Sequence, residues 1–446
     1  MASPPGSPPR VLSANRAQIE LRTFDLEALL PAGHRARLIW FAVEQLDLQA
    51  FYDAIKARES LPGRPSLDPR VLLALWLYAT SEAVGSARQL SRLCERDHAY
   101  QWICGGLRPN HHTLSDFRVD HGEKLDDLLT QLLATLMKQK LVTLKRVAQD
   151  GIRVRASAGA SSFRRGSTLR ERCLSEASTQ VALLKKELED DPSASTAREA
   201  AARQRAAREQ EEAVKRALAE LPDVQASYER NLRKRGKRGR KTSSGGQKSG
   251  PREGEDKGEA RISTTDPEAR VMKMGDGGFR PAYNVQFATD AEHRLVVGVD
   301  VSNAGTDMDQ MVGMFDQVVR RTGEKPAEWL VDGGYTKLKA IDEVASHGTL
   351  VYAPVPAPRR AGINAHDRKD DDTDRSFEWR KRMATEEAKA IYRYRAATAE
   401  PVHGDLRKWR GFGQMPVRGK VKARAIALLM ALTYDIIHAA SLSPAA

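Results

Sequence analysis

Residues 147–154 read Val147-Ala148-Gln149-Asp150-Gly151-Ile152-Arg153-Val154, and their alternation of apolar and polar residues predicts a β-strand. Successive side chains of a strand point to opposite faces, so Asp150 shares a face with Ile152 and Val154. A carboxylate on an apolar face is destabilising if it is buried without a partner. Asp150 is therefore a candidate functional residue, although Asp150-Gly151 would also suit a type I′ hairpin turn.

The second half of the chain predicts a sheet around this strand. Residues 283–288 and 295–301 alternate as two strands joined by a short polar turn. The elements predicted after them are a helix over 307–321, a strand over 329–331, a helix over 337–345, a strand over 350–352, and helices over 385–395 and 423–440. Strands followed by alternating helices and strands predict a mixed sheet, an α/β (α+β) fold class.

The residues before 145 are helical in pattern. Asp68-Pro69 places an N-cap and a first-turn proline before the apolar run 71–78, which predicts a buried helix. Residues 86–95 predict a short amphipathic helix. Thr113-Leu114-Ser115-Asp116 resembles a capping box, and the helix that it begins is expected to run on through Leu136.

The chain is therefore expected to have five segments. They are a Pro-rich tail at 1–30, an all-α domain at 31–144, the first strand of the sheet domain at 145–160, a helical insertion at 161–270, and the rest of the sheet domain at 271–446. The insertion is rich in Ala, Glu, Lys and Arg and is typical of a helical hairpin or coiled-coil arm. Within it, residues 233–241 carry seven cations in nine, which suits either contact with a DNA backbone or a solvated flexible loop.

Composition points to a polyanionic partner. The chain has 446 residues, 72 of them Lys or Arg and 59 of them Asp or Glu, for a net charge of +13. Such a surplus favours nucleic acid as the partner. Three cysteines exclude a disulfide scaffold. The apolar run 425–434 is shorter than the roughly 20 residues of a membrane span, and the Pro/Ser-rich start lacks a signal-peptide pattern, so we expect an intracellular protein without a membrane span.

Two further carboxylates stand at informative positions. Asp332 follows the predicted strand 329–331 and precedes Gly333-Gly334, at the strand end where α/β proteins collect reactive groups. A turn aspartate or a helix N-cap is the alternative. Glu400 would share a helix face with arginines seven residues to either side, where a solvated salt-bridge face is the alternative. Hard oxygen ligands in this order suit two Mg²⁺ or Mn²⁺ ions, which can activate water and stabilise a leaving oxygen at a phosphodiester.

Several stretches of the chain together resemble one family. They are residues 109–118, 149–156, 263–270, 278–286, Val331-Asp332-Gly333-Gly334-Tyr335, and the spacing of Tyr392, Arg395, Glu400 and Arg407. These stretches resemble the bacterial insertion-sequence transposases of the DDE type, which have a ribonuclease H-like catalytic core. The resemblance is to the branch with a helical N-terminal domain and a long insertion after the first catalytic Asp.

The resemblance implies a set of roles. Asp150, Asp332 and Glu400 would be the catalytic triad and the ligands of two metal ions. Tyr392, Arg395 and Arg407 would support it, with Arg407 standing where the family's signature usually has Lys. The fold implied is a ribonuclease H-like core preceded by an all-α domain and interrupted by a helical insertion.

The helical domain is the expected DNA-reading part. It carries a set of arginines that we expect to contact DNA, namely Arg88, Arg92, Arg96, Arg108 and Arg118. A helical packing domain or dimer interface is the alternative. Cys94, His98, Cys104 and His111 have a spacing that would admit zinc, but they lack the tight Cys pair of structural zinc sites, which favours core packing for the cysteines.

The function expected from these features is transposition. The chain would bind the terminal inverted repeats of an insertion sequence as a homodimer, cut the double-stranded DNA and transfer the strands to target DNA. We expect it in the bacterial cytoplasm, at the nucleoid. The alternatives are a non-catalytic DNA-binding protein derived from a transposase, and a metal-dependent nuclease without strand transfer.

Overall fold

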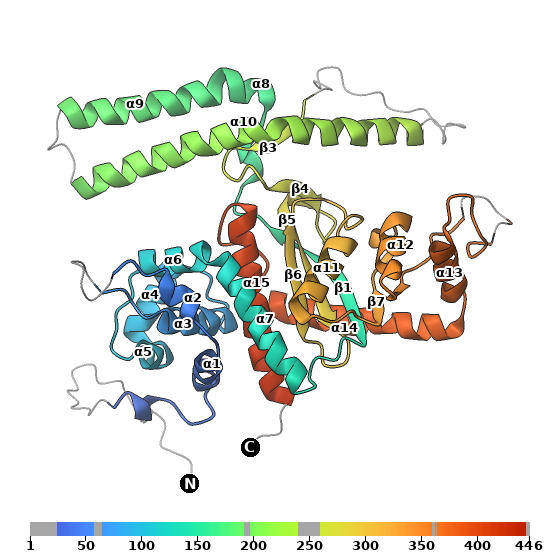
Figure 1. Ribbon diagram of the computed structural model, residues 1–446. Helices are drawn as coiled ribbons and strands as arrows, with labels where there is room; N and C mark the ends of the chain where they lie inside the picture. The colour runs from blue at the N-terminus through green and yellow to red at the C-terminus, as the bar shows by residue number, and fades with distance from the viewer. Residues whose placement is uncertain are drawn as a thin grey trace, which may run out of the picture.

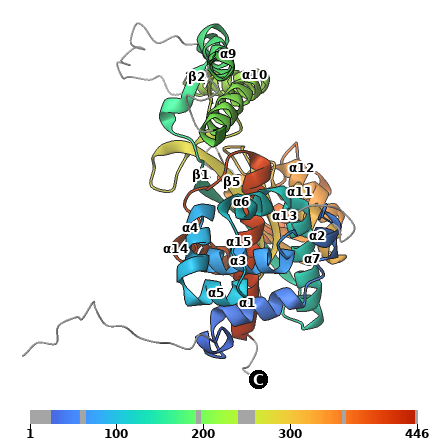
Figure 2. The same ribbon diagram turned by 90° about the vertical axis from the view of Figure 1, so that its left-hand side faces the viewer.

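The protein consists of a helical N-terminal region, a mixed sheet with its helices, and a helical arm that projects from them (Figure 1). The computed structural model describes residues 25–57, 65–190, 197–239, 259–358, 362 and 364–442. A turn of 90° shows the arm apart from the other two parts, joined to them at its base (Figure 2). The α/β class predicted from the sequence is confirmed.

The N-terminal region is all helical. Its elements are η1 (Glu27–Leu29), α1 (Arg35–Glu44), α2 (Gln49–Asp53), α3 (Pro69–Ser81), α4 (Ala87–Arg96), α5 (His98–Cys104), α6 (His111–Asp120) and α7 (Gly122–Lys138). The predicted cap of α3 is present, because the Asp68 side chain accepts from the Arg70 N–H at 2.8 Å. The predicted capping box at Thr113 is wrong. Asn110 is the N-cap of α6 and bonds two N–H groups at 2.9 Å, so the helix begins earlier and ends before His121.

The sheet has a strand order typical of a ribonuclease H-like core. Its strands are β1 (Arg146–Arg155), β4 (Arg270–Lys273), β5 (Phe279–Asp290), β6 (Val296–Ser302), β7 (Glu328–Leu330) and β8 (Leu350–Tyr352). Across the sheet the order is β6-β5-β1-β7-β8, with β4 paired to the first part of β5. β5 is antiparallel to β1 and β6, whereas β7 and β8 run parallel to β1. β1 is thus the central strand.

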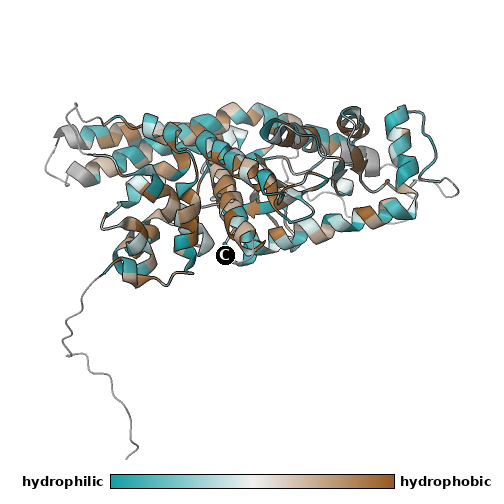
Figure 3. Ribbon diagram, turned by 60° about the horizontal axis from the view of Figure 1, so that its bottom comes forward, coloured by the Kyte–Doolittle hydropathy of each residue, from teal (hydrophilic) through white to brown (hydrophobic). Residues whose placement is uncertain are grey.

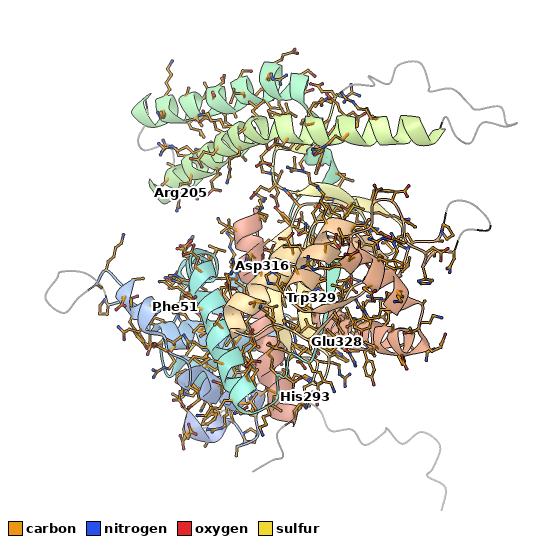
Figure 4. All side chains as sticks on the ribbon, turned by 45° about the vertical axis from the view of Figure 1, so that its right-hand side comes forward. Phe51, Arg205, His293, Asp316, Glu328 and Trp329 are labelled. Atoms are coloured by element: carbon orange, nitrogen blue, oxygen red, sulfur yellow. The ribbon has the colours of Figure 1, made fainter. Side chains whose placement is uncertain are left out.

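Helices cover both faces of this sheet. They are α11 (Met311–Thr322), η4 (Gly333–Tyr335), α12 (Leu338–Ser346), α13 (Asp374–Met383) and α14 (Glu386–Lys408). α11 packs on the face of Gly298, where a Cβ would meet Met314 and Val318. α14 lies on the opposite face, against β1 and Phe287. Trp329 of β7 fills the α11 side, with its ring centroid 5.4 Å from that of Phe315 (Figure 4).

The helix α15 (Lys420–Leu442) joins the helical region to the sheet. It packs against α7, α3 and α6 and also along the edge strand β6, so that one hydrophobic core runs through both parts. Figure 3 shows its apolar residues in the middle of the molecule. A helix was predicted here over 423–440, and the helix found is a few residues longer at each end. Its length and composition alone would suit a membrane span. Because 67% of its apolar window is buried inside the protein, α15 is a core helix.

The arm is a helical hairpin on a two-stranded ribbon. Its elements are η2 (Ala160–Ser162), β2 (Phe163–Arg165), α8 (Gly166–Thr168), the π-helical turn η3 (Leu169–Cys173), α9 (Leu174–Asp190), α10 (Ala197–Gly239) and β3 (Arg261–Ser263). A small core of its own, centred on Leu169, Val214 and Leu221, holds the hairpin to the ribbon. Of the basic run 233–241, the last two residues lie outside the described part of the chain, as does most of the tail at 1–30.

Candidate active site

Asp150 lies in the middle of the central strand. It is paired in register with Phe287 of β5, and β1 continues for five residues beyond it, so the hairpin-turn alternative is wrong. Its Oδ2 accepts from Arg395 Nη1 at 3.0 Å, and its Oδ1 accepts from the Gly151 N–H at 2.8 Å. Burial raises the pKa of Asp150, with a further contribution from Asp307, although Arg395 and the Gly151 N–H oppose the rise.

Asp332 lies beside Asp150 at the end of the neighbouring strand. Ala148 of β1 pairs with Leu330 of β7, so two residues further along the parallel strands Asp150 and Asp332 come level. Asp332 is also the N-cap of η4, since its Oδ1 accepts from the Gly334 N–H at 2.7 Å. Burial raises the pKa of Asp332, the nearby charge of Asp150 adds to this rise, and the Gly334 N–H opposes it. The N-cap alternative is therefore confirmed, and the same residue also lies level with Asp150.

Glu400 comes from α14, which continues through Pro401 although a helix was predicted only as far as Arg395. Its side chain is exposed. No three His, Cys, Asp or Glu side chains of the described residues form a group that could hold a metal ion. The structure brings the two aspartates level on adjacent strands, and Glu400 stands on α14, the helix that also carries Arg395. The part of Glu400 in the expected triad stays a prediction.

The supporting residues of α14 lie on the sheet. Arg395 bonds Asp150, and its guanidinium is 6.0 Å from the centroid of the Tyr392 ring. Burial opposes the protonated form of Arg395, but the charges of Asp150 and its neighbours outweigh burial and raise its pKa. Arg407 Nη2 donates to the Arg153 carbonyl at 3.3 Å. Two guanidinium groups therefore face the central strand on the side of Asp150.

His403, one turn after Glu400, is a neutral packing residue. Burial and the charge of Arg407 lower its pKa to about 4. Its ring centroid is 6.0 Å from that of Phe287. It is therefore uncharged at neutral pH.

Asp307 is a carboxylate of this site that the sequence prediction missed. It lies in the segment between β6 and α11, four residues before the helix begins. Its Oδ1 accepts from Asn284 Nδ2 at 2.6 Å and from Gln286 Nε2 at 2.8 Å. The signal was present in β5: Asn284 and Gln286 share one face of a buried strand, and two buried amides need an acceptor there.

The arginines expected to contact DNA fall into two groups. Arg88, Arg92, Arg96 and Arg108 are exposed, and the first three follow one side of α4. Arg118 is different, because it is only 6% exposed and its guanidinium lies 4.3 Å from the centroid of the Trp76 ring. It also donates to the Gly85 carbonyl at 2.6 Å. The expectation that Arg118 contacts DNA is therefore wrong for this conformation, since its side chain fills the interior.

The cysteines of the zinc alternative are core residues. Cys94 and Cys104 are both buried, and a hydrogen bond between the two side chains raises the pKa of Cys94. His98 is exposed, and His111 stacks on His112 at a centroid distance of 4.1 Å. The four side chains form no metal-binding group, and none exists elsewhere in the described part of the chain.

Comparison with known families agrees with this architecture. A model described as a transposase domain (DUF772) matches residues 24–120, and a model described as a transposase DDE domain matches residues 249–436. No curated protein and no solved structure matches the chain. The sheet and its two level aspartates are of the kind found in DDE-type nucleic-acid enzymes. The chain belongs to the transposases that join a DUF772 N-terminal domain to a DDE catalytic domain.

The arm explains why Asp150 lies outside both matches. Asp332 and Glu400 fall within residues 249–436, but Asp150 falls in the stretch 121–248 that neither model covers. The hairpin separates β1 from β5 along the chain, and the nine register pairs between these strands return Asp150 to the centre of the DDE domain's sheet.

Proposed function

We propose that this transposase cuts DNA at the ends of a mobile element and joins the freed ends to target DNA, with Asp150, Asp332 and Glu400 as its catalytic residues. The observation that supports this most is the level placement of Asp150 and Asp332 on adjacent parallel strands of the DDE domain. Glu400 stands on α14, the helix whose Arg395 bonds Asp150.

The carboxylates suit divalent cations by their chemistry. Asp150 and Asp332 offer hard oxygen donors. The negative charge of Asp150 contributes to the raised pKa of Asp332, and a cation between them would offset this repulsion. Two Mg²⁺ or Mn²⁺ ions held by Asp150, Asp332 and Glu400 would supply an activated water and stabilise the leaving oxygen. Arg395, Tyr392 and Arg407 would orient the scissile phosphate on the same face.

The reaction proposed has two in-line displacements. In the first, a water oxygen bonds to the phosphorus at the element's end, and the 3′-oxygen leaves and takes up a proton. In the second, that 3′-hydroxyl loses its proton, its oxygen bonds to a target phosphorus, and the target's own 3′-oxygen leaves. Each step breaks one P–O bond and makes another.

The helical region would recognise the inverted repeats of the element. The exposed arginines of α4 support this, because a row of cations on one helix side suits the phosphates beside a groove. Bringing two ends together requires two active sites, so we propose a homodimer on DNA, acting at the bacterial nucleoid.

The decisive variant is Asp150→Asn. We expect it to abolish Mg²⁺-dependent cleavage and strand transfer while leaving filter binding of inverted-repeat DNA unchanged. Cleavage at the wild-type rate by this variant would refute the proposed site. If the wild-type protein binds ends without nicking them, it is a non-catalytic DNA-binding protein, and if it nicks without joining, it is a nuclease.

A further inference from the structure

Two fully buried glutamines, Gln149 of β1 and Gln286 of β5, form the centre of a hydrogen-bond network behind the candidate site. Gln149 Nε2 donates to Gln286 Oε1 at 3.1 Å and to the Gln310 carbonyl, at the start of α11, at 3.0 Å. Gln149 immediately precedes Asp150 in the strand, so the two side chains point to opposite faces of the sheet. The glutamine pair therefore lies on the α11 face, and Asp150 meets Arg395 on the other face.

The residues three before and three after Asp332 both bond this glutamine pair. Trp329 Nε1 donates to Gln149 Oε1 at 3.2 Å. The Tyr335 hydroxyl donates to Gln286 Oε1. Both aromatic side chains are fully buried. The segment that carries Asp332 is therefore anchored to the pair on either side of the aspartate.

Tyr335 closes the turn that holds the Asp332 carboxylate. Its N–H donates to the Asp332 carbonyl at 3.2 Å, and the N–H of Gly334, one residue earlier, donates to Asp332 Oδ1 at 2.7 Å. Burial raises the pKa of the Tyr335 hydroxyl well above its usual value, so the hydroxyl keeps its proton and stays a donor. The anchored ring fixes η4, and η4 orients the carboxylate.

The amide of Gln286 has a partner for each of its polar atoms. Its Oε1 accepts from Gln149 and Tyr335, and its Nε2 donates to Asn284 Oδ1 at 3.1 Å and to Asp307 Oδ1 at 2.8 Å. A buried network whose members are satisfied holds its side chains in one arrangement. The acceptor that Tyr335 uses is therefore fixed relative to β1, the strand of the other aspartate.

We propose that Tyr335 is a positioning residue, whose hydroxyl bond to Gln286 sets where the Asp332 carboxylate lies relative to Asp150. It acts through the backbone of η4 from the opposite face of the sheet. This inference rests on the proposed function for the role of the two aspartates in cleavage. Removal of the hydroxyl should slow the chemical step, because small displacements of reacting groups are costly, and should leave the affinity for DNA unchanged.

The test is Tyr335→Phe in the full-length protein, which removes the hydroxyl alone. Gln286 Oε1 keeps its bond from Gln149, so no buried acceptor is left without a partner and the variant should fold. We expect kcat for Mg²⁺-dependent cleavage to fall about tenfold, with KM for element-end DNA within about twofold of the wild type.

The matched control is Tyr283→Phe. Tyr283 is also fully buried in the sheet, and its hydroxyl donates to Asp266 Oδ1 at 2.7 Å. Asp266 Oδ1 likewise keeps a second bond, from the Gly419 N–H at 3.2 Å. Tyr283 lies opposite Val154, four residues along β1 from Asp150. This variant loses a comparable buried hydrogen bond and should keep kcat within about twofold of the wild type.

Hydrogen exchange of the DNA-free protein gives a readout that does not depend on cleavage. We expect the amides of residues 331–337, which include the Gly334 N–H, to exchange at least about threefold faster in Tyr335→Phe and at the wild-type rate in Tyr283→Phe. If Tyr335→Phe folds poorly, Gln149→Met removes the Trp329 bond on the other side of Asp332 and should raise the same exchange.

Two results would overturn the positioning role. One is wild-type exchange over residues 331–337 in Tyr335→Phe, and the other is a fall in kcat or a rise in this exchange that is equally large in Tyr283→Phe. If the wild-type protein itself cuts no DNA, the proposed function fails, and hydrogen exchange alone then decides whether Tyr335 orients the Asp332 turn.

Discussion

Asp150 is a carboxylate that lies inside the fold, and burial of a charged group opposes folding. A carboxylate in a central strand loses hydration, and this raises its pKa and destabilises the folded state at neutral pH. The ion pair between Arg395 and Asp150, at 3.0 Å, offsets part of this destabilisation.

Gly151 is the residue whose size the site tolerates least. We expect Gly151→Ala to displace Asp307, because the added Cβ would lie 2.5 Å from Gln286 Nε2 and 2.7 Å from Asn284 Oδ1. The free energy of unfolding should fall by about 1–3 kcal/mol, and cleavage should fall with it. Urea denaturation and a cleavage assay measure both. Gly313→Ala on α11, where nothing lies within 4 Å of the added Cβ, is the control. It should leave cleavage unchanged and should not lower the free energy of unfolding, because Ala favours a helix more than Gly does.

Substitutions at Arg118 and Arg92 should have different effects, because Arg118 is expected to stabilise the fold and Arg92 to contact DNA. Burial lowers the pKa of Arg118 to about 10, so it is charged at neutral pH and held by Trp76 and the Gly85 carbonyl. We expect Arg118→Ala to destabilise the protein by about 2 kcal/mol or more. Arg92→Ala should leave stability unchanged and reduce the salt dependence of DNA binding by about 0.9 in logarithmic slope. An unstable Arg92→Ala with normal DNA binding would contradict this assignment.

For single residues, the sequence alone could identify those that follow a local pattern but not those whose role depends on tertiary packing. Asp150 and Asp332 were predictable because a period of two and a strand end fix where they lie. Asp307 was not, because its partners stand 23 and 21 residues earlier on β5. Arg118 was taken for a surface residue because no local pattern shows that Trp76 lies above it.

Among the elements, strands and buried helices were predicted well and helix ends less well. β1, β5 and β6 were expected within a few residues of their bounds. α14 was expected to stop near Arg395 because a proline inside a helix removes a hydrogen bond, yet it continues to Lys408 with Val402 and Leu406 fully buried. Tertiary packing of the apolar side outweighs the local penalty of Pro401.

The helix α15 carries a buried acid that gives a pH test. Asp435 is completely buried; its Oδ1 accepts from the Val296 N–H at 2.8 Å, and burial raises its pKa well above 3.8. A carboxyl with a raised folded-state pKa binds protons more tightly in the folded protein, so stability falls as pH rises from 3.8 toward that pKa. We expect Asp435→Asn to be at least as stable as the wild type at pH near 8.

The same comparison at lower pH serves as the control for this expectation. The advantage of Asp435→Asn should narrow as pH is lowered, because the wild-type carboxyl then becomes neutral in both states. Thermal melts of both proteins across the range measure the difference. A variant that is less stable at high pH and equal at low pH would show that Asp435 is stabilised as an anion by Arg321 and Arg410.

In the whole molecule, the arm is separate from the core shared by the helical region and the sheet. Its apolar cluster contains none of the residues of the main core, and Figure 4 labels Arg205 on the hairpin away from the sheet. The arm's ends meet at the ribbon, where Arg165 pairs with Arg261.

The arm should therefore be removable. We expect a chain with residues 166–260 replaced by Asn-Gly to keep the melting temperature of the main core, because a two-residue turn suits the antiparallel pair of Arg165 and Arg261. Calorimetry should show one unfolding transition at the wild-type temperature. Circular dichroism should show a lower helix content than in the wild type. An aggregated or unfolded product would mean that the arm stabilises β1 and β5 across their junction.

The position of α15 in the chain bears on how the protein is made. The helices α1, α3, α6 and α7 come early in synthesis, yet the surface they pack against is translated after every other described element. A polypeptide terminated before Lys420 would leave the apolar sides that α15 covers on those helices exposed. Truncated products are then expected to enter proteolysis and not to persist as DNA-binding competitors of the intact enzyme.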